Sequence, residues 1–180
     1  RAILLVGFGS GGRRRSELAG LRVERLQDEE PVPADPSNPA SERLLCLSIQ
    51  LGRTKTGAAD DDQRAVIVGR PVEALKAWLA AARIAKGPVF RGIDRWGNLD
   101  DRAITPQTVN TIVKRRAARA GINPARISAH GLRSGYMTEA FEQGVPLPDA
   151  MRQSQHRSVQ QAARYYDDAA RKSGRAARLV

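Results

Sequence analysis

The sequence predicts one mainly helical domain with a small antiparallel β-sheet, an α+β fold. The length of 180 residues suits a single domain. Apolar residues recur at helical spacing through much of the second half, and two strand-like runs lie at 43–51 and 64–68. With 41% hydrophobic residues the chain can build a core, which excludes disorder. We expect residues 1–180 to form this single domain, and we expect it to be cut from a longer protein because the apolar run at 2–9 starts abruptly.

The first half of the chain is expected to hold short elements. A short helix is expected over 15–19, ended by Gly20, and a strand over 21–26 follows with imperfect alternation. Residues 27–41 contain four prolines and few large apolar side chains, so we expect an exposed, mobile excursion there. The two strand-like runs then form a hairpin, joined by a long loop that includes Thr56, Gly57 and the acidic residues 60–62.

The second half is expected to be helical, with a glycine-rich loop at 87–97. Proline suits the first turn of a helix, a threonine or serine caps its start, and glycine follows its end. These signals predict one helix from Pro71, a second from Thr105 to Gly121, a third from Ser128 to Gln143, and a last one from Ser158, which pairs with Gln161 in a capping box.

The distribution of charge indicates a polyanionic partner. Lys and Arg number 30 against 19 Asp and Glu, which gives a net charge of +11. Residues 102–133 hold seven cations and no acid, whereas residues 24–42 hold six acids and one cation. A cationic face suits nucleic acid, and such complexes weaken steeply as salt rises. Composition alone also allows a merely solvated surface.

Other classes of protein are excluded by what the sequence lacks. No apolar run approaches the roughly 18 residues of a membrane span, and no signal peptide precedes residue 1. The single cysteine, Cys46, cannot form an internal disulfide, and two histidines offer no structural zinc site. We therefore expect a cytoplasmic protein with no metal and no membrane partner.

Four short motifs follow one another along the chain. They are the string Gly12-Arg-Arg-Arg-Ser-Glu-Leu18, the string Gly52-Arg-Thr-Lys-Thr56, the string Ser128-Ala-His-Gly-Leu-Arg133, and a histidine, His156, that stands nine residues before Tyr165. Together, and in this order, the motifs resemble those of the tyrosine recombinase and integrase family over nearly the whole chain. Gln155 departs from the pattern, because the family usually has glycine before the second histidine.

The resemblance implies a recombinase or integrase of a phage or mobile element that cuts and rejoins DNA through a 3′-phosphotyrosine. Tyr165 would be the nucleophile and His130 would help it lose its proton. Lys55 would protonate the departing 5′ oxygen, and His156 would hydrogen-bond a phosphate oxygen. The implied set is therefore catalytic Arg14, Lys55, His130, Arg133, His156 and Tyr165, supporting Glu17 next to Arg14 or a histidine, and a basic DNA-binding face of Arg53, Lys114, Arg115 and Arg119.

The chemistry of these side chains agrees with such roles. Arginine grips phosphate through a planar, permanently charged fork, so Arg14 and Arg133 suit the nonbridging oxygens. A free phenol has a pKa of about 10, so Tyr165 needs a base or cationic surroundings. If Ser128 caps its helix, His130 and Arg133 share the first turn, where free backbone N–H groups attract anions.

Two neighbouring tyrosines compete for the role of nucleophile. Val159, Ala162, Ala163 and Tyr166 fall on one apolar stripe at helical spacing, which predicts that Tyr166 is packed. Tyr165 points about 100° away from that stripe and is free to face a cleft.

Three rival functions remain. Residues 7–12 contain a G-x-G-x-x-G string after an apolar run, which can mark a dinucleotide site, but the following helix is too short for a crossover. A cationic face also suits a non-catalytic DNA-binding relic. Type IB topoisomerases use similar chemistry and would relax DNA without site preference.

The resemblance also implies partners. The expected partner is double-stranded DNA in the bacterial or phage-host nucleoid, bound by four protomers on two sites, with accessory DNA-bending proteins. Neither ATP nor another cofactor is implied, because the phosphotyrosyl bond conserves the energy of the broken phosphodiester. An N-terminal DNA-clamping domain would precede this one, and the basic tail from Arg171 would dock on a neighbouring protomer.

Overall fold

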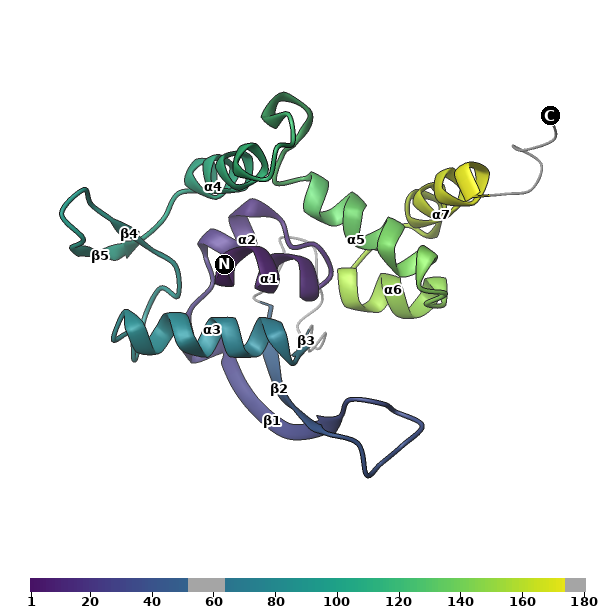
Figure 1. The fold of residues 1–180 in the computed structure, drawn as a ribbon, viewed down its shortest axis with the longest axis horizontal. Helices are drawn as coiled ribbons and strands as arrows, with labels where there is room; N and C mark the ends of the chain where they lie inside the picture. Colours follow the sequence, from purple (N-terminus) through teal and green to yellow (C-terminus); the bar gives the residue numbers. More distant parts are fainter. Residues whose placement is uncertain (52–63, 174–180) are drawn as a thin grey trace.

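The computed structural model describes residues 1–51 and 64–173 and confirms the mainly helical fold with small antiparallel sheets (Figure 1). Helix α1 lies in the middle of the molecule, with α3 and α4 on two sides and α5–α7 at one end (Figure 1). The helices are α1 (Ala2–Gly9), α2 (Arg15–Ala19), α3 (Arg70–Ala81), α4 (Pro106–Arg119), α5 (Gly131–Glu142), α6 (Leu147–Ser154) and α7 (Val159–Ser173). Within the described ranges, none of them is both long and apolar enough to cross a membrane.

Three antiparallel strands form the larger sheet in the order β1 (Leu26–Pro33), β2 (Arg43–Gln50) and β3 (Arg64–Val68). The two expected strands over 43–51 and 64–68 are confirmed, and the loop expected between them lies outside the described residues. The exposed excursion over 27–41 is wrong in its first part, because Leu26–Pro33 pairs with β2. Its prolines are tolerated because β1 is an edge strand whose register shifts between Glu29 and Val32.

The strand expected over 21–26 is also wrong. Val23–Arg25 form a 3₁₀ turn, and only Leu26 enters a strand. Another short turn of this kind, Pro124–Arg126, precedes α5. Apolar spacing misled the prediction here because Leu21 is buried in the core without belonging to a strand. Its carbonyl accepts from the N–H of Val89, which also lies outside the strands, at 2.9 Å.

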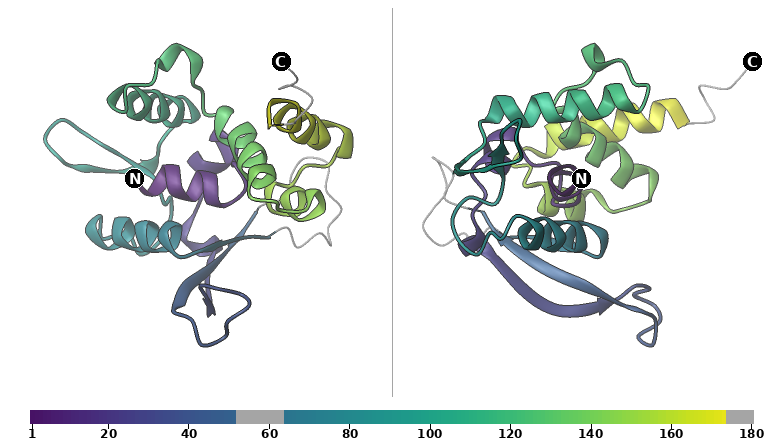
Figure 2. Two further views of the ribbon diagram at one scale, coloured as in Figure 1. Left: turned by 45° about the vertical axis from the view of Figure 1, so that its right-hand side comes forward. Right: turned by 60° about the vertical axis from the view of Figure 1, so that its left-hand side comes forward.

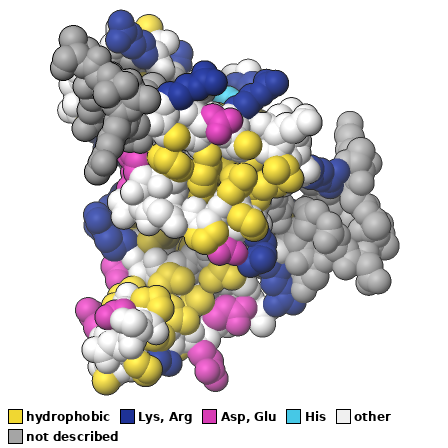
Figure 3. Space-filling view, turned by 90° about the vertical axis from the view of Figure 1, so that its right-hand side faces the viewer, with side chains coloured by type: hydrophobic (Ala, Val, Ile, Leu, Met, Phe, Trp, Pro, Cys, Tyr) yellow, Lys and Arg dark blue, Asp and Glu magenta, His cyan; other side chains and the backbone are white. Residues whose placement is uncertain are grey.

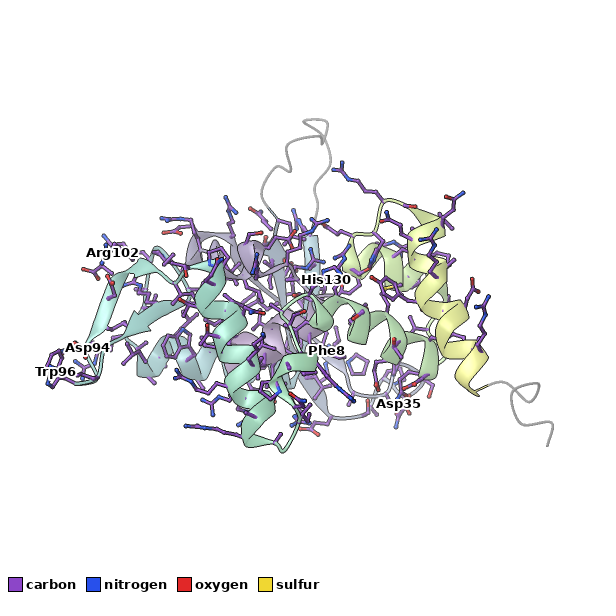
Figure 4. The ribbon with its side chains drawn as sticks, turned by 90° about the horizontal axis from the view of Figure 1, so that it is seen from above. Phe8, Asp35, Asp94, Trp96, Arg102 and His130 are labelled. Atoms are coloured by element: carbon purple, nitrogen blue, oxygen red, sulfur yellow. The ribbon has the colours of Figure 1, made fainter. Side chains whose placement is uncertain are left out.

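Two further elements were missed. The glycine-rich loop at 87–97 contains the start of a hairpin, β4 (Arg91–Ile93) and β5 (Leu99–Ala103). The Asp94 carboxylate stabilises the turn of this hairpin, because it accepts hydrogen bonds from the backbone N–H groups of Trp96 and Asn98. Figure 4 shows Asp94, Trp96 and Arg102 together at this far end of the molecule. Helix α6 was missed as well.

The apolar run at 2–9 is helix α1 rather than a strand. A helix that is apolar all round is expected to be buried, and Figure 2 shows α1 enclosed by the other elements. Ala2, Ile3 and Val6 are buried. The G-x-G-x-x-G string therefore starts within a helix, whereas a dinucleotide site requires it to follow a strand. The dinucleotide-binding rival thus loses the observation on which it rested.

Local helix signals succeeded at two starts and failed at a third. The Thr105 hydroxyl accepts from the Thr108 N–H at 3.1 Å, and the Ser158 hydroxyl accepts from the Gln161 N–H at 3.2 Å. Both hydroxyl caps are confirmed, and the second of them is one half of the expected capping box. The start of α5 at Ser128 is wrong. The helix begins at Gly131, and His130 is its N-cap residue without a side-chain cap bond.

The hydrophobic core has two parts. The larger cluster joins α1–α4 to the sheet through Val6, Leu75 and Val109, all fully buried. The smaller cluster joins α5, α6 and α7 around Met137 and Ala162. On the surface of this end of the molecule, a band of hydrophobic side chains lies below a group of Lys and Arg side chains (Figure 3).

Candidate active site

Arg14 and Glu17 form the part of the site that α2 provides. Arg14 is the residue before α2, in an extended conformation, and its N–H donates to Glu17 Oε2 at 3.0 Å. Its guanidinium Nη1 donates to Glu17 Oε1, also at 3.0 Å. The Arg14 side chain is 58% exposed, so Glu17 fixes one edge of the guanidinium while other donors face outward.

Arg133 and His156 meet between α5 and the loop after α6. The Arg133 side chain is buried at 7% exposure, and its Nε donates to His156 Nε2 at 3.2 Å. Its Nη1 donates to the backbone carbonyl of Ser154. The other ring nitrogen, His156 Nδ1, lies 2.7 Å from the hydroxyl of Ser154. Ser154 at the end of α6 therefore contacts two side chains of the motifs, the arginine and the second histidine.

The two tyrosines of α7 have different surroundings. The Tyr165 ring lies edge-on to His156, with 5.9 Å between ring centroids. Tyr166 instead packs edge-on against Phe141, and its hydroxyl donates to the Val145 carbonyl at 2.9 Å. The prediction that Tyr166 is packed is confirmed. The expectation that Tyr165 lies free of the packed stripe is wrong in part, because Tyr165 is also half-buried against the same hydrophobic cluster. The predicted stripe is wrong at its first member, because Val159 is 61% exposed in the first turn of α7.

The pKa values of Arg133 and His156 are shifted by burial and by the charges of the other residues of the site. Burial lowers the pKa of Arg133, the positive charge of Arg14 lowers it further, and Glu17 and Tyr165 raise it. Burial also lowers the pKa of His156 to about 4, and the charges of Arg133 and Arg14 act in the same direction. His156 is therefore a neutral imidazole near pH 7, set among cations that would attract an anion.

His130 and the basic face occupy the neighbouring surface. His130 is exposed at the start of α5 (Figure 4), and its charge is among those that lower the pKa of His156. The turn before it is tied to α4, because Asn110 Oδ1 accepts the Ala129 N–H at 2.9 Å. The three expected DNA-contacting residues of α4 lie on its solvent side, with Lys114 half-buried and Arg115 and Arg119 exposed. Lys55 and Arg53 lie outside the described residues.

Sequence reasoning missed Arg13, which is buried behind the site. Its Nε donates to the Ser10 carbonyl at 2.7 Å, and its Nη2 donates to the Gln153 carbonyl. Burial lowers the pKa of Arg13 to about 10, while Glu17, 3.9 Å away, raises it. Nothing in a run of three arginines distinguishes the buried member from the exposed ones, so no sequence signal could have identified it.

Sequence reasoning also missed Gln153, because its hydrogen bonds join it to residues far away in the sequence. Its amide nitrogen donates to the carbonyls of Gly9 and Val66, and its amide oxygen accepts from the Val66 N–H. This side chain therefore pairs with both backbone groups of one residue on β3. The contact fixes α6, and with it the loop that carries His156, against α1 and the sheet.

The arrangement can bind and polarise an oxyanion. Two guanidinium groups, a neutral imidazole and a phenol come from the residue before α2, from α5, from the loop after α6 and from α7. Fixed charges and dipoles of this kind stabilise negative charge that develops during a reaction. Among the described residues, no group of three or more His, Cys, Asp and Glu side chains is placed to hold a metal ion.

Known proteins match this chain over nearly its whole length. The phage integrase family matches residues 1–172. An integrase/recombinase XerD homologue of Selenomonas ruminantium is 31% identical over 167 residues, which make up 93% of this chain and 46% of that protein. The chain thus spans about half the length of this relative.

Solved structures share the fold. XerH site-specific recombinase bound to its palindromic difH substrate matches with a TM-score of 0.71 at 19% identity, over 98% of this chain and 44% of that one. The Tn1549 transposon integrase in complex with circular intermediate DNA matches with a TM-score of 0.62 at 17% identity, over 96% and 56% of the two chains.

Proposed function

Because the chain belongs to the phage integrase family, we propose that it is the catalytic domain of a site-specific tyrosine recombinase that cuts and rejoins double-stranded DNA. One observation carries the proposal. The Tyr165 ring lies edge-on to His156, with 5.9 Å between ring centroids, and His156 Nε2 accepts from the buried guanidinium of Arg133 at 3.2 Å. The positive charge of Arg14 also lowers the pKa of that guanidinium. Such convergence is expected where one phosphate must meet a nucleophile and two cations.

In the first step the Tyr165 hydroxyl oxygen attacks the phosphorus, and the bond to the 5′ oxygen breaks. The phenol proton passes to His130, and Lys55 supplies a proton to the departing oxygen; the role of Lys55 follows from its motif alone. In the second step the 5′-hydroxyl of another strand attacks the phosphotyrosine, which restores a phosphodiester and releases Tyr165. One ester bond is exchanged for another in each step, so the overall reaction needs no ATP.

Arg14 and Arg133 hold the nonbridging oxygens in both steps. Their forks match a phosphate geometrically, and their charge does not depend on pH in the working range. Exposed Arg14 can approach the phosphate from the solvent side. Buried Arg133 is held in place by its hydrogen bonds to His156 and to the Ser154 carbonyl. Arg53 and the α4 residues Lys114, Arg115 and Arg119 would contact flanking phosphates.

The assembly around this domain is also a proposal. A pair of DNA sites bound by four copies gives each strand a partner for the exchange, and accessory proteins that bend DNA would help to bring the sites together. An N-terminal DNA-clamping domain would complete the grip on the duplex, and it accords with the relatives being about twice as long as this chain.

The test is a suicide substrate nicked near the scissile phosphate, which traps the covalent intermediate. The chain should form an adduct that resists denaturation and maps to Tyr165. Tyr165→Phe should lose the adduct entirely while DNA affinity stays within about twofold, since only the hydroxyl is removed. Tyr166→Phe is the matched control and should retain the adduct, because that hydroxyl bonds the Val145 carbonyl.

An adduct that survives in Tyr165→Phe would refute the assignment. DNA binding without any adduct in the unmodified chain would favour the non-catalytic relic. Relaxation of supercoiled plasmid without site preference would favour topoisomerase-like chemistry.

A further inference from the structure

The end of α6 carries a hydroxyl whose hydrogen-bonding role is fixed by its surroundings. Ser154 is fully buried, with 0% exposure. Its Oγ lies 2.7 Å from the Ala150 carbonyl oxygen and 2.7 Å from His156 Nδ1. A hydroxyl has one hydrogen, and a carbonyl can only accept, so the hydrogen of Ser154 is directed to Ala150. The hydroxyl oxygen must then accept a hydrogen from His156 Nδ1.

The second ring nitrogen is constrained independently. Arg133 Nε lies 3.2 Å from His156 Nε2, and a guanidinium N–H can only donate. His156 Nε2 must therefore present a lone pair. Both contacts require the same form of the ring, a neutral imidazole with its hydrogen on Nδ1. The pKa of His156, lowered to about 4 by burial and by the charges of the neighbouring arginines, agrees with a neutral ring.

Ser154 thereby holds Arg133 in two ways. Its backbone carbonyl accepts from Arg133 Nη1, and its hydroxyl fixes the ring that accepts from Arg133 Nε. Of the five N–H donors of a guanidinium, these two contacts use the one on Nε and one of the two on Nη1, and they leave the three remaining donors on Nη1 and Nη2 for a ligand. In the described part of the chain no other protein acceptor is paired with them.

We propose that Ser154 is a positioning residue that locks His156 in the neutral Nδ1–H form, so that His156 orients the guanidinium of Arg133 as a hydrogen-bond acceptor. In this form His156 has no N–H to give to a phosphate through Nε2, so the proposal replaces the phosphate-donor role that the family resemblance implies for His156. The catalytic consequence rests on the proposed recombinase function, because only a reaction at phosphate gives the orientation of Arg133 an effect on rate. The form of the ring does not depend on that function.

The first test uses ¹⁵N-labelled chain and long-range ¹H–¹⁵N spectra near pH 7, which distinguish protonated from unprotonated ring nitrogens. The sequence has two histidines, so exposed His130 serves as an internal reference. His156 is expected to show a protonated Nδ1 and an unprotonated Nε2. A protonated Nε2 in the unmodified chain would overturn the proposal without any variant having to fold.

The second test compares Ser154→Ala with Ser134→Ala, whose hydroxyl is half-exposed on α5 and donates to the Gly131 carbonyl at 3.2 Å. Ser154→Ala should shift His156 toward the Nε2–H form and lower the single-turnover cleavage rate constant by about tenfold, with DNA affinity within about twofold. Ser134→Ala should change neither. An unchanged ring form, or an unchanged rate constant, in Ser154→Ala would contradict the positioning role.

The two proposals fail in different ways. If the unmodified chain forms no adduct, the recombinase function fails and the ring spectra still decide the role of Ser154. If the adduct forms normally and the ring carries its hydrogen on Nε2, the recombinase function stands and the positioning role is wrong.

Discussion

Replacing Gln155 by glycine should stabilise the protein. Gln155 directly follows the last residue of α6 and has φ 54° and ψ 46°, the left-handed conformation. This conformation costs an L-residue roughly 1–2 kcal/mol. No hydrogen bond of its side chain occurs among the described residues to offset this cost. Glycine adopts the conformation without strain but loses about 0.5–1 kcal/mol of chain entropy on folding. The difference favours Gln155→Gly by about 1 kcal/mol, the usual preference for glycine at the end of a helix.

Thermal unfolding followed by circular dichroism would measure this gain. For a domain of this size, about 1 kcal/mol corresponds to a rise in Tm of about 2–4 °C. Gln160→Gly is the matched control, because Gln160 is exposed in the first turn of α7 and the same replacement there should lower stability by up to about 1 kcal/mol. A Tm for Gln155→Gly at or below that of the unmodified chain would refute the reasoning, since the backbone at residue 155 would then not be strained.

Two further predictions concern Arg13, which is buried behind the site, and His156, which is partly buried within it. Arg13→Met removes the donors to the Ser10 and Gln153 carbonyls and should lower the free energy of unfolding, measured with urea, by about 2–4 kcal/mol. Arg15→Met, at an exposed position, should change it by no more than about 0.5 kcal/mol. Equal stabilities of the two variants would contradict this prediction. His156 has a folded pKa of about 4 against 6.5 when unfolded, so the unfolded chain binds the extra proton between these values and stability must fall as pH drops from about 6.5 to 4. Because the ring is only partly buried, we expect a loss of about 1–2 kcal/mol, absent in His156→Gln; parallel pH profiles for the two proteins would show that the ring is not neutral in the fold.

Features that depend on neighbouring residues in the sequence could be predicted from it. The caps at Thr105 and Ser158 involve a hydroxyl and an N–H three residues away, so their signal is local. The packing of Tyr166 followed from the period of α7. By contrast, β1 forms although proline disfavours it, because β2 supplies the pairing from across the sheet.

The residues that assemble the site depend on contacts between distant segments, and these the sequence could not show. The family motifs placed Arg14, Arg133, His156 and Tyr165 in one site without saying how they are held. Arg13 and Gln153 reach across more than 80 residues to bind backbone carbonyls, and either would be read as a solvated surface residue. The sequence also could not show the role of Ser154. That role depends on a hydrogen bond to the ring of His156, which the left-handed backbone of Gln155 turns back toward the end of α6.

The glycine string that resembles a nucleotide motif has a packing role instead. A Cβ on Gly11 would lie 2.3 Å from the Gln153 carbonyl oxygen, and one on Gly12 would lie 2.3 Å from the Cα of Arg133. Both residues also have positive φ, so the turn after α1 combines a backbone conformation and a close approach that only glycine allows. This approach brings the segment that carries Arg13 and Arg14 directly against α5 and the end of α6. Gly12 thus lets the segment that carries Arg13 and Arg14 lie directly against the backbone of Arg133, and the charge of Arg14 acts on the Arg133 guanidinium. The glycines of this string are therefore explained by packing and not by a phosphate-binding loop.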